Sequence, residues 1–140
     1  MSVEEMLKLH SMHNDEEINQ GNLAVVERVF TPDCVRHNPN MPDIVGHKAE
    51  KQFTTMLRAS FPDIQMTIED RFACDDKLTV RWTGRGTHQG EYMGIPPSGK
   101  QLTVSGISIH RFADGKIQES WDLWDALGML QQRGVVPGGE

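Results

Sequence analysis

The chain has 140 residues, of which 37% are hydrophobic and 24% charged, as is typical of one soluble domain with its own core. The net charge of −6 and the lack of a Lys/Arg-rich stretch argue against nucleic acid as a partner. No apolar run reaches the roughly 18 residues of a membrane span, and the N-terminus lacks a secretory core, so we expect no membrane contact and a cytoplasmic protein. Cys34 and Cys74 match neither a disulfide framework nor a CxxC motif.

The first half of the chain predicts helices around one short strand. Ser2 and Glu5 match a capping box, which marks the start of a helix. We expect this helix to run to about Gln20, where Gly21 ends it, and a second helix to span 23–30. A strand over 34–38 follows, broken off by Pro39 and Pro42. A further helix over 47–61 is ended by Pro62.

The second half predicts strands. In chain order we expect a hairpin of 64–74 and 78–88, a loop over 89–100, a hairpin over 101–125, a helix over 126–133 capped by Asp125, and a loose tail over 135–140. Helices first and long strands later predict an α+β fold. We expect a strongly curved antiparallel sheet wrapped on about three helices, as one domain spanning residues 1–140 with its tail from 134.

The last hairpin determines which face of the sheet Asp122 occupies. Asp114-Gly115 after a short residue favours a three-residue turn with a bulge, because Gly115 accepts a positive φ. That register pairs Gly106 with Asp122 and places Asp122 on the face of Ser108, whereas a strict two-residue turn would pair it with Ile107. A carboxylate among small residues leaves room for a ligand beside it, so Asp122 is our leading functional candidate.

Long stretches of the chain resemble the SnoaL-like polyketide cyclase family. The resemblance rests on VRWTGRGTHQGEYMGIPPSGK (80–100), SGISIHRFADGKIQESWDLWDALGMLQQ (105–132), FPDIQMTIED (61–70) and the helix led by Gly46, and extends over residues 10–132. The GxxxGIPPxG loop and the ExWD step are fairly specific when they occur together in this order. The resemblance implies the cone-shaped fold of nuclear transport factor 2, a barrel-like sheet with a single deep pocket, and often a homodimer formed through the outer sheet face, onto which Ile107 and Ile109 alternate.

The resemblance also implies a chemistry. Cyclases of this family close the ring of a polyketide ester by intramolecular aldol condensation without metal or cofactor, and Asp122 matches their acid/base. Their neighbouring strand carries larger polar side chains where this chain has Gly106 and Ser108, so the particular reaction stays open. We expect a small, apolar, carbonyl-bearing substrate and a lyase- or isomerase-like activity. The alternatives are a related hydratase or lyase and a non-catalytic module that binds a small hydrophobic ligand or serves as a dimeric interaction domain.

A base in an apolar pocket becomes effective because burial raises its pKa toward the working pH, and we expect this of Asp122. His37, on the early strand, is a candidate donor opposite Asp122, with a backbone-satisfied histidine as the equally weighted alternative. Further candidates for the pocket, because they are aromatic, hydroxyl-bearing or close to the loop, are Trp82, His88, Met93, Ser108 and Trp124. His110 shares the predicted face of Asp122 but lies toward the hairpin tip.

A metal site is not expected. His10, His13 and Glu17 fall on one helical face at the spacing of metal ligands, but one helix supplies too few ligands. We interpret this triplet as an ordinary helix face.

Overall fold

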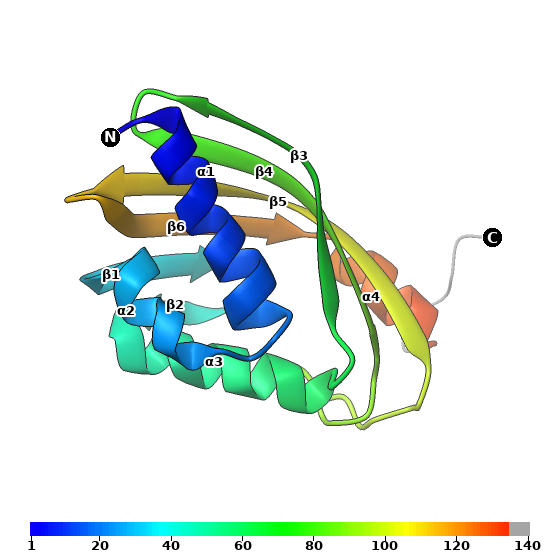
Figure 1. Ribbon diagram of the computed structural model, residues 1–140. Helices are drawn as coiled ribbons and strands as arrows, with labels where there is room; N and C mark the ends of the chain where they lie inside the picture. The colour runs from blue at the N-terminus through cyan, green and yellow to red at the C-terminus, as the bar shows by residue number, and fades with distance from the viewer. Residues whose placement is uncertain (135–140) are drawn as a thin grey trace.

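One curved sheet of six strands organises the molecule. In the computed structural model, which describes residues 1–134, the strands are β1 (Phe30–Asn38), β2 (Met41–Val45), β3 (Gln65–Cys74), β4 (Lys77–Thr87), β5 (Gln101–Ala113) and β6 (Lys116–Trp124). They follow the order β2-β1-β6-β5-β4-β3, and the sheet bends without closing into a barrel (Figure 1). Strand β1 runs parallel to β6, while every other neighbouring pair is antiparallel, so the predicted α+β fold with a curved antiparallel sheet is confirmed except at this one pair.

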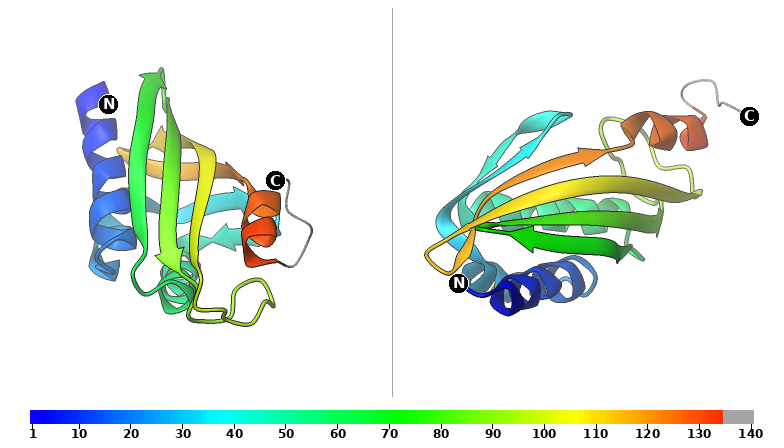
Figure 2. Two further views of the ribbon diagram at one scale, coloured as in Figure 1. Left: turned by 90° about the vertical axis from the view of Figure 1, so that its right-hand side faces the viewer. Right: turned by 90° about the horizontal axis from the view of Figure 1, so that it is seen from above.

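Helices cover the concave side of the sheet and one of its ends (Figure 2). They are α1 (Val3–Ser11), the π-helix η1 (Met12–Ile18), the 3₁₀-helix η2 (Leu23–Val25), α2 (Val26–Val29), α3 (Gly46–Ser60) and α4 (Ala126–Arg133). The capping box is confirmed, since Ser2 Oγ accepts from the Glu5 amide at 3.1 Å and Glu5 reaches back. Gly21 adopts a φ of 75° just after the first helical segment.

Strand β1 begins at Phe30, four residues before its predicted start, and β2 was not predicted at all. Pro42 lies within β2, which has only β1 as a neighbour. An edge strand tolerates proline because the missing amide would not have joined a ladder. The predicted end of β1 at Asn38 is confirmed, with Pro39 in the turn that follows, whereas Pro42 lies within an edge strand. The predicted loose tail, residues 135–140, falls outside the described residues.

The turn between β5 and β6 has two residues, not three. Asp114 and Gly115 have φ values of 53° and 76°, as in a type I′ turn, and the strands pair from the residues directly outside them. Farther along, Phe112 pairs with Ile117 but Arg111 with Glu119, which leaves Gln118 as a bulge. The predicted pairing of Gly106 with Asp122 is therefore wrong. Because the bulge adds one residue to β6, Asp122 nevertheless lies on the predicted face of the sheet, that of Ser108.

The interior is divided between a solid core and a hollow region. One buried cluster joins α1, α2 and the sheet through Met6, Val26, Val29, Phe30, Leu78, Phe112 and Ile117. A second comprises Ile18, Phe61, Ile64, Tyr92, Leu102 and Met129, and all six of these residues line a cavity. The first cluster holds α1 on the sheet, and the second forms the apolar walls of a pocket.

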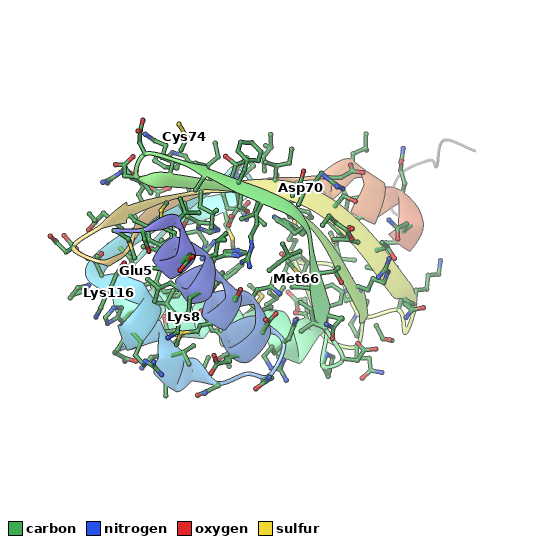
Figure 3. All side chains as sticks on the ribbon, turned by 45° about the horizontal axis from the view of Figure 1, so that its top comes forward. Glu5, Lys8, Met66, Asp70, Cys74 and Lys116 are labelled. Atoms are coloured by element: carbon green, nitrogen blue, oxygen red, sulfur yellow. The ribbon has the colours of Figure 1, made fainter. Side chains whose placement is uncertain are left out.

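The two cysteines are free thiols in different environments. Cys34 is buried on β1, whereas Cys74 is exposed beside the β3–β4 turn (Figure 3). No helix within residues 1–134 is long and apolar enough to cross a membrane.

Candidate functional site

A cavity of about 150 Å³ lies between the concave face of the sheet and the helical segments α1, η1 and α3. Most of its lining is apolar and comes from the second buried cluster, together with Phe53, Leu57, Val104 and Trp124. A polar wall, defined here as His10, His13, Arg36, Ser108, His110 and Asp122, faces the same cavity. Most of a bound ligand would meet hydrocarbon, with polar groups along one side.

Asp122 on β6 is largely buried and accepts two hydrogen bonds. Arg36 Nη1 donates to Oδ2 at 2.8 Å, and the hydroxyl of Ser108, its partner across the β5–β6 ladder, donates to Oδ1 at 2.7 Å. Trp82 Nε1 in turn donates to Ser108 Oγ at 3.0 Å. A guanidinium and a hydroxyl therefore hold the two carboxyl oxygens in place. Asp122 is thus held by an ion pair, whereas the sequence predicted a carboxylate surrounded by apolar groups.

Arg36 on β1 is the centre of the polar wall. Its guanidinium donates from Nε to Glu50 Oε1 at 3.0 Å and from Nη1 to Asp122, so it bridges α3 and β6. Its side chain is 6% exposed, and burial alone would disfavour its charge. The two carboxyl groups outweigh that penalty and raise the pKa of Arg36 above its ordinary value. Arg36 therefore carries a buried positive charge between two acidic side chains.

The π-helix η1 brings a second layer of polar groups behind Arg36. His13 Nδ1 lies 2.7 Å from Glu17 Oε1, and Thr54 on α3 donates to Glu17 Oε2 at 2.5 Å. Burial acts to raise the pKa of Glu17, but its interaction with His13, and then the hydrogen bond from Thr54, outweigh burial and lower the pKa. Burial raises the pKa of Glu50, and the charge of Arg36 only partly opposes it. The two acids therefore differ, with Glu17 the stronger.

Two histidines of the polar wall, His10 and His110, are neutral. Burial lowers the pKa of His10 and of His110 well below the ordinary value, and the charge of Arg36 acts in the same direction. His110 Nδ1 lies 2.7 Å from Ser120 Oγ, and the rings of His10 and His110 are 5.1 Å apart. The interpretation of His10 and His13 as an ordinary helix face is wrong, because both line the cavity.

The donor atoms of His13, Glu17 and Glu50 lie within 4.8 Å of one another, so α3 supplies the ligand that one helix lacked. A cation there would compete with the Arg36 guanidinium, which already contacts Glu50 and lies 3.4 Å from His13 Nε2. The charge of Arg36 makes this cluster a poor metal site.

Four of the predicted site residues line the cavity: Asp122, Trp82, Ser108 and Trp124. Trp124 Nε1 donates to Asn38 Oδ1 at 3.3 Å. The space beside Gly106 is not free for a ligand, because a Cβ there would lie 2.3 Å from the Trp82 ring. The indole fills the room that the small residues were expected to leave.

Three predicted residues lie outside the cavity lining. His37 points to the outer face of the sheet, where its ring bonds Glu119 Oε2 at 2.6 Å, because strand alternation turns the neighbouring Arg36 inward. His88 is buried but stacks on Phe61 with ring centroids 5.4 Å apart. Met93 is exposed at a φ of 54° in the loop before β5.

Sequence reasoning missed three residues that the structure brings to or beside the cavity: Arg36, Glu50 and Tyr92. Tyr92 precedes Met93, and its ring is buried against Phe61. Burial, and then the charge of Asp122, raise the pKa of Tyr92 to about 12, so its phenol keeps its proton. Arg36 could have been found from its strand, since it alternates with Cys34 and Asn38 on the buried side.

Known proteins resemble this chain in both sequence and architecture. The sequence profile of SnoaL-like polyketide cyclases matches residues 10–133. Nogalonic acid methyl ester cyclase of Streptomyces nogalater is 30% identical over 93 residues, which are 64% of this chain and 67% of the relative. Aklanonic acid methyl ester cyclase DauD of Streptomyces sp. (strain C5) is 25% identical over 79% of this chain and 67% of its own length. The crystal structure of AclR from Streptomyces galilaeus superposes with a TM-score of 0.84 at 27% identity, over 99% of this chain and 87% of AclR. The chain therefore belongs to the SnoaL-like polyketide cyclase family.

Proposed function

We propose that this protein is a cyclase that uses Asp122 as general acid/base to close a ring in a small, largely apolar substrate with carbonyl groups, namely a polyketide ester. The observation that carries the proposal is one carboxylate facing an otherwise mostly apolar cavity. The relatives named as methyl ester cyclases support this choice of substrate class.

The proposed reaction is an intramolecular aldol addition. Asp122 takes a proton from a carbon between two carbonyl groups, and the resulting enolate carbon forms a bond to a second carbonyl carbon of the same molecule. That carbonyl becomes an alkoxide, which receives the proton back from Asp122. No atom is lost from the substrate, and the steps use only groups of the protein and substrate.

An enolate needs a hydrogen-bond donor, and Tyr92 is the group that we assign to this role. Its phenol stays protonated, and it lines the cavity. The Arg36 N–H groups, by contrast, are directed at Asp122, Glu50 and His13. A phenol directed at the developing negative charge would stabilise the transition state more than the substrate.

The test is turnover of a panel of aromatic polyketide methyl esters and simpler β-dicarbonyl compounds by the wild type and by Asp122→Asn. Asparagine keeps the shape but cannot carry the proton, so turnover should fall about 10²–10⁴-fold while ligand binding persists. Asp125→Asn is the matched control, because Asp125 caps α4 at Gly128 N and asparagine caps equally well. Equal turnover by Asp122→Asn and the wild type would refute the role of Asp122.

Tyr92→Phe tests the donor separately. It retains the ring that packs on Phe61 and removes only the hydroxyl, so we expect about a 100-fold loss in kcat with little change in binding. Unchanged kcat would remove Tyr92 from the mechanism and leave Asp122 untouched.

A second candidate, a binding module without turnover, is favoured by one observation. Several polar groups of the cavity already satisfy one another, as in the pairs Trp82–Ser108, Ser108–Asp122 and His110–Ser120. Such groups stabilise a cavity without acting on its ligand. Binding of the panel compounds with no turnover by the wild type would support this candidate.

We also propose that two copies of this chain associate through the outer face of the sheet. Ile107, Ile109, Trp121 and Leu123 pair with each other across β5 and β6 and are 37–68% exposed. An apolar patch of this kind marks an interface. Sedimentation at micromolar concentration should give a dimer for the wild type and a monomer for Leu123→Lys. Leu127→Lys on α4, which is 59% exposed, is the matched control, and a monomeric wild type would refute the interface.

A further inference from the structure

Glu50 on α3 is a buried acid whose two oxygens have unequal partners. Oε1 accepts from Arg36 Nε at 3.0 Å. Oε2 is buried and has no hydrogen-bond partner among residues 1–134. The residue is 1% exposed, so water does not supply the missing partner freely. An ionised carboxylate in this position would leave a charged oxygen buried and unsatisfied, which is costly.

The surrounding hydrogen bonds have fixed directions. Arg36 Nη2 has only hydrogens to offer and lies 3.4 Å from His13 Nε2, which therefore accepts. The hydrogen of His13 is then on Nδ1, which donates to Glu17 Oε1, and Thr54 donates to Glu17 Oε2. Both oxygens of the Glu17 carboxylate therefore accept a hydrogen bond. A carboxyl oxygen of Glu50 lies within 4.8 Å of a carboxyl oxygen of Glu17. Glu50 Oε2 has no hydrogen-bond donor among residues 1–134.

We propose that Glu50 carries a proton, which it shares with Glu17, and that the neutral carboxyl group positions Arg36 against Asp122. A proton on Glu50 gives Oε2 a hydrogen-bond partner. It also removes one of the two negative charges, those of Glu17 and Glu50, from a buried cluster. Arg36 then has a single charged partner in the cavity, Asp122. When Glu50 loses the proton, two carboxylates compete for the same guanidinium and the hold on Asp122 weakens.

Charged and titratable groups from three elements face Glu50. They are His13 and Glu17 from η1, Arg36 and Cys34 from β1 and, through Arg36, Asp122 from β6. Burial, opposed by Arg36 and reinforced by Glu17, raises the pKa of Glu50 from 4.5 to about 7. A raised pKa stabilises the folded protein below pH 4.5, and this contribution is lost as the pH rises through the folded value. The loss should therefore fall between about pH 4.5 and pH 7.

Glu50→Gln tests the proton without any substrate. Glutamine offers an amide N–H where the proposed carboxyl has its proton, and a carbonyl oxygen for Arg36. The Tm difference between Glu50→Gln and the wild type should therefore grow in favour of the variant from pH 5 to pH 8. We expect an infrared band of a protonated carboxyl group in the wild type near neutral pH, and this band should be absent from the variant. Glu91→Gln, the same change at an exposed loop residue, is the control and should alter neither signal.

The positioning role rests on the proposed function and is tested by the pH profile of kcat/KM. The wild type should lose activity as Glu50 deprotonates above neutral pH, and Glu50→Gln should lack this falling limb, whereas Glu50→Ala should lose activity at every pH. A Tm difference that is flat with pH, or a carboxyl band that persists in Glu50→Gln, overturns the proton assignment. A falling limb retained in Glu50→Gln overturns the positioning role. A panel without turnover contradicts only the proposed function, because the Tm and infrared signals do not depend on it.

Discussion

Two neighbouring residues of β1, Arg36 and His37, form ion pairs on opposite faces of the same sheet. Arg36 pairs with Asp122 on the concave side, where the two side chains are 6% and 12% exposed. His37 pairs with Glu119 on the convex side, where they are 32% and 26% exposed. Both pairs join β1 to β6, and their geometries are similar. They differ in the solvent around them.

This difference determines what each pair contributes. A buried charge that loses its partner keeps the full cost of desolvation, whereas exposed partners are rehydrated and screened by salt. The inner pair is therefore costly to break and lies where the proposed chemistry occurs. The outer pair adds little stability. Three measurements can break or sharpen this contrast.

The largest effect is expected from Arg36→Ala. It leaves Asp122 and Glu50 buried without their shared cation, and we expect a loss of about 3–5 kcal/mol in the free energy of unfolding by urea. The matched change is Arg111→Ala, which removes the partner of Glu119 at 3.2 Å on the outer face and should cost below about 1 kcal/mol. Equal losses in the two variants would remove the distinction between the faces.

A smaller effect is expected from Gly106→Ala, which adds one methyl group to the inner face. The new Cβ would lie 2.3 Å from Trp82 Cζ2, so the indole must shift away from Ser108, at a cost of about 1–3 kcal/mol. Gly84→Ala is the control, because its Cβ would meet mainly the flexible Met66 side chain. Thermal unfolding of both variants measures the difference, and a Gly106→Ala protein as stable as Gly84→Ala would show that the indole is not fixed.

The smallest effect is expected from His37→Gln. Hydrogen bonds to Glu119, and then to Asp43, raise the pKa of His37. This contribution is present below the ordinary histidine pKa of about 6.5 and is lost as the pH rises through the folded value. Because the ring is partly exposed, it amounts to a few tenths of a kcal/mol. The Tm should fall slightly more between pH 6 and pH 8 in the wild type than in His37→Gln, and high salt should abolish the difference.

The face of Asp122 was predictable from sequence, but its register was not. Alternation along a strand is a local property, and the Asp-Gly pair marks the turn. The bulge at Gln118 has no local signature, and the predicted three-residue turn reached the same face by a different count. Family resemblance predicted the fold and drew attention to Asp122.

The partners of Asp122 were not predictable because they come from distant parts of the chain. Arg36 reaches Asp122 through the parallel pairing of β1 with β6, and Glu50 arrives on α3, which packs against β1 and β2. Pairings between residues 84–87 positions apart leave no periodic pattern in either strand. His37 was selected because it is a histidine, whereas the side chain that lines the cavity is that of the adjacent Arg36.

Because the sheet bends without closing, it has two edge strands, and each carries features that discourage other chains from adding to it. Strand β2 has five residues and includes Pro42, which offers no amide to an incoming strand. Strand β3 is longer, but a register shift between Ile68 and Asp70 interrupts its ladder, and Glu69, Asp70 and Arg71 place charges at that point. Loss of these features would lead first to aggregation, through sheets joined edge to edge, while the cavity remained intact.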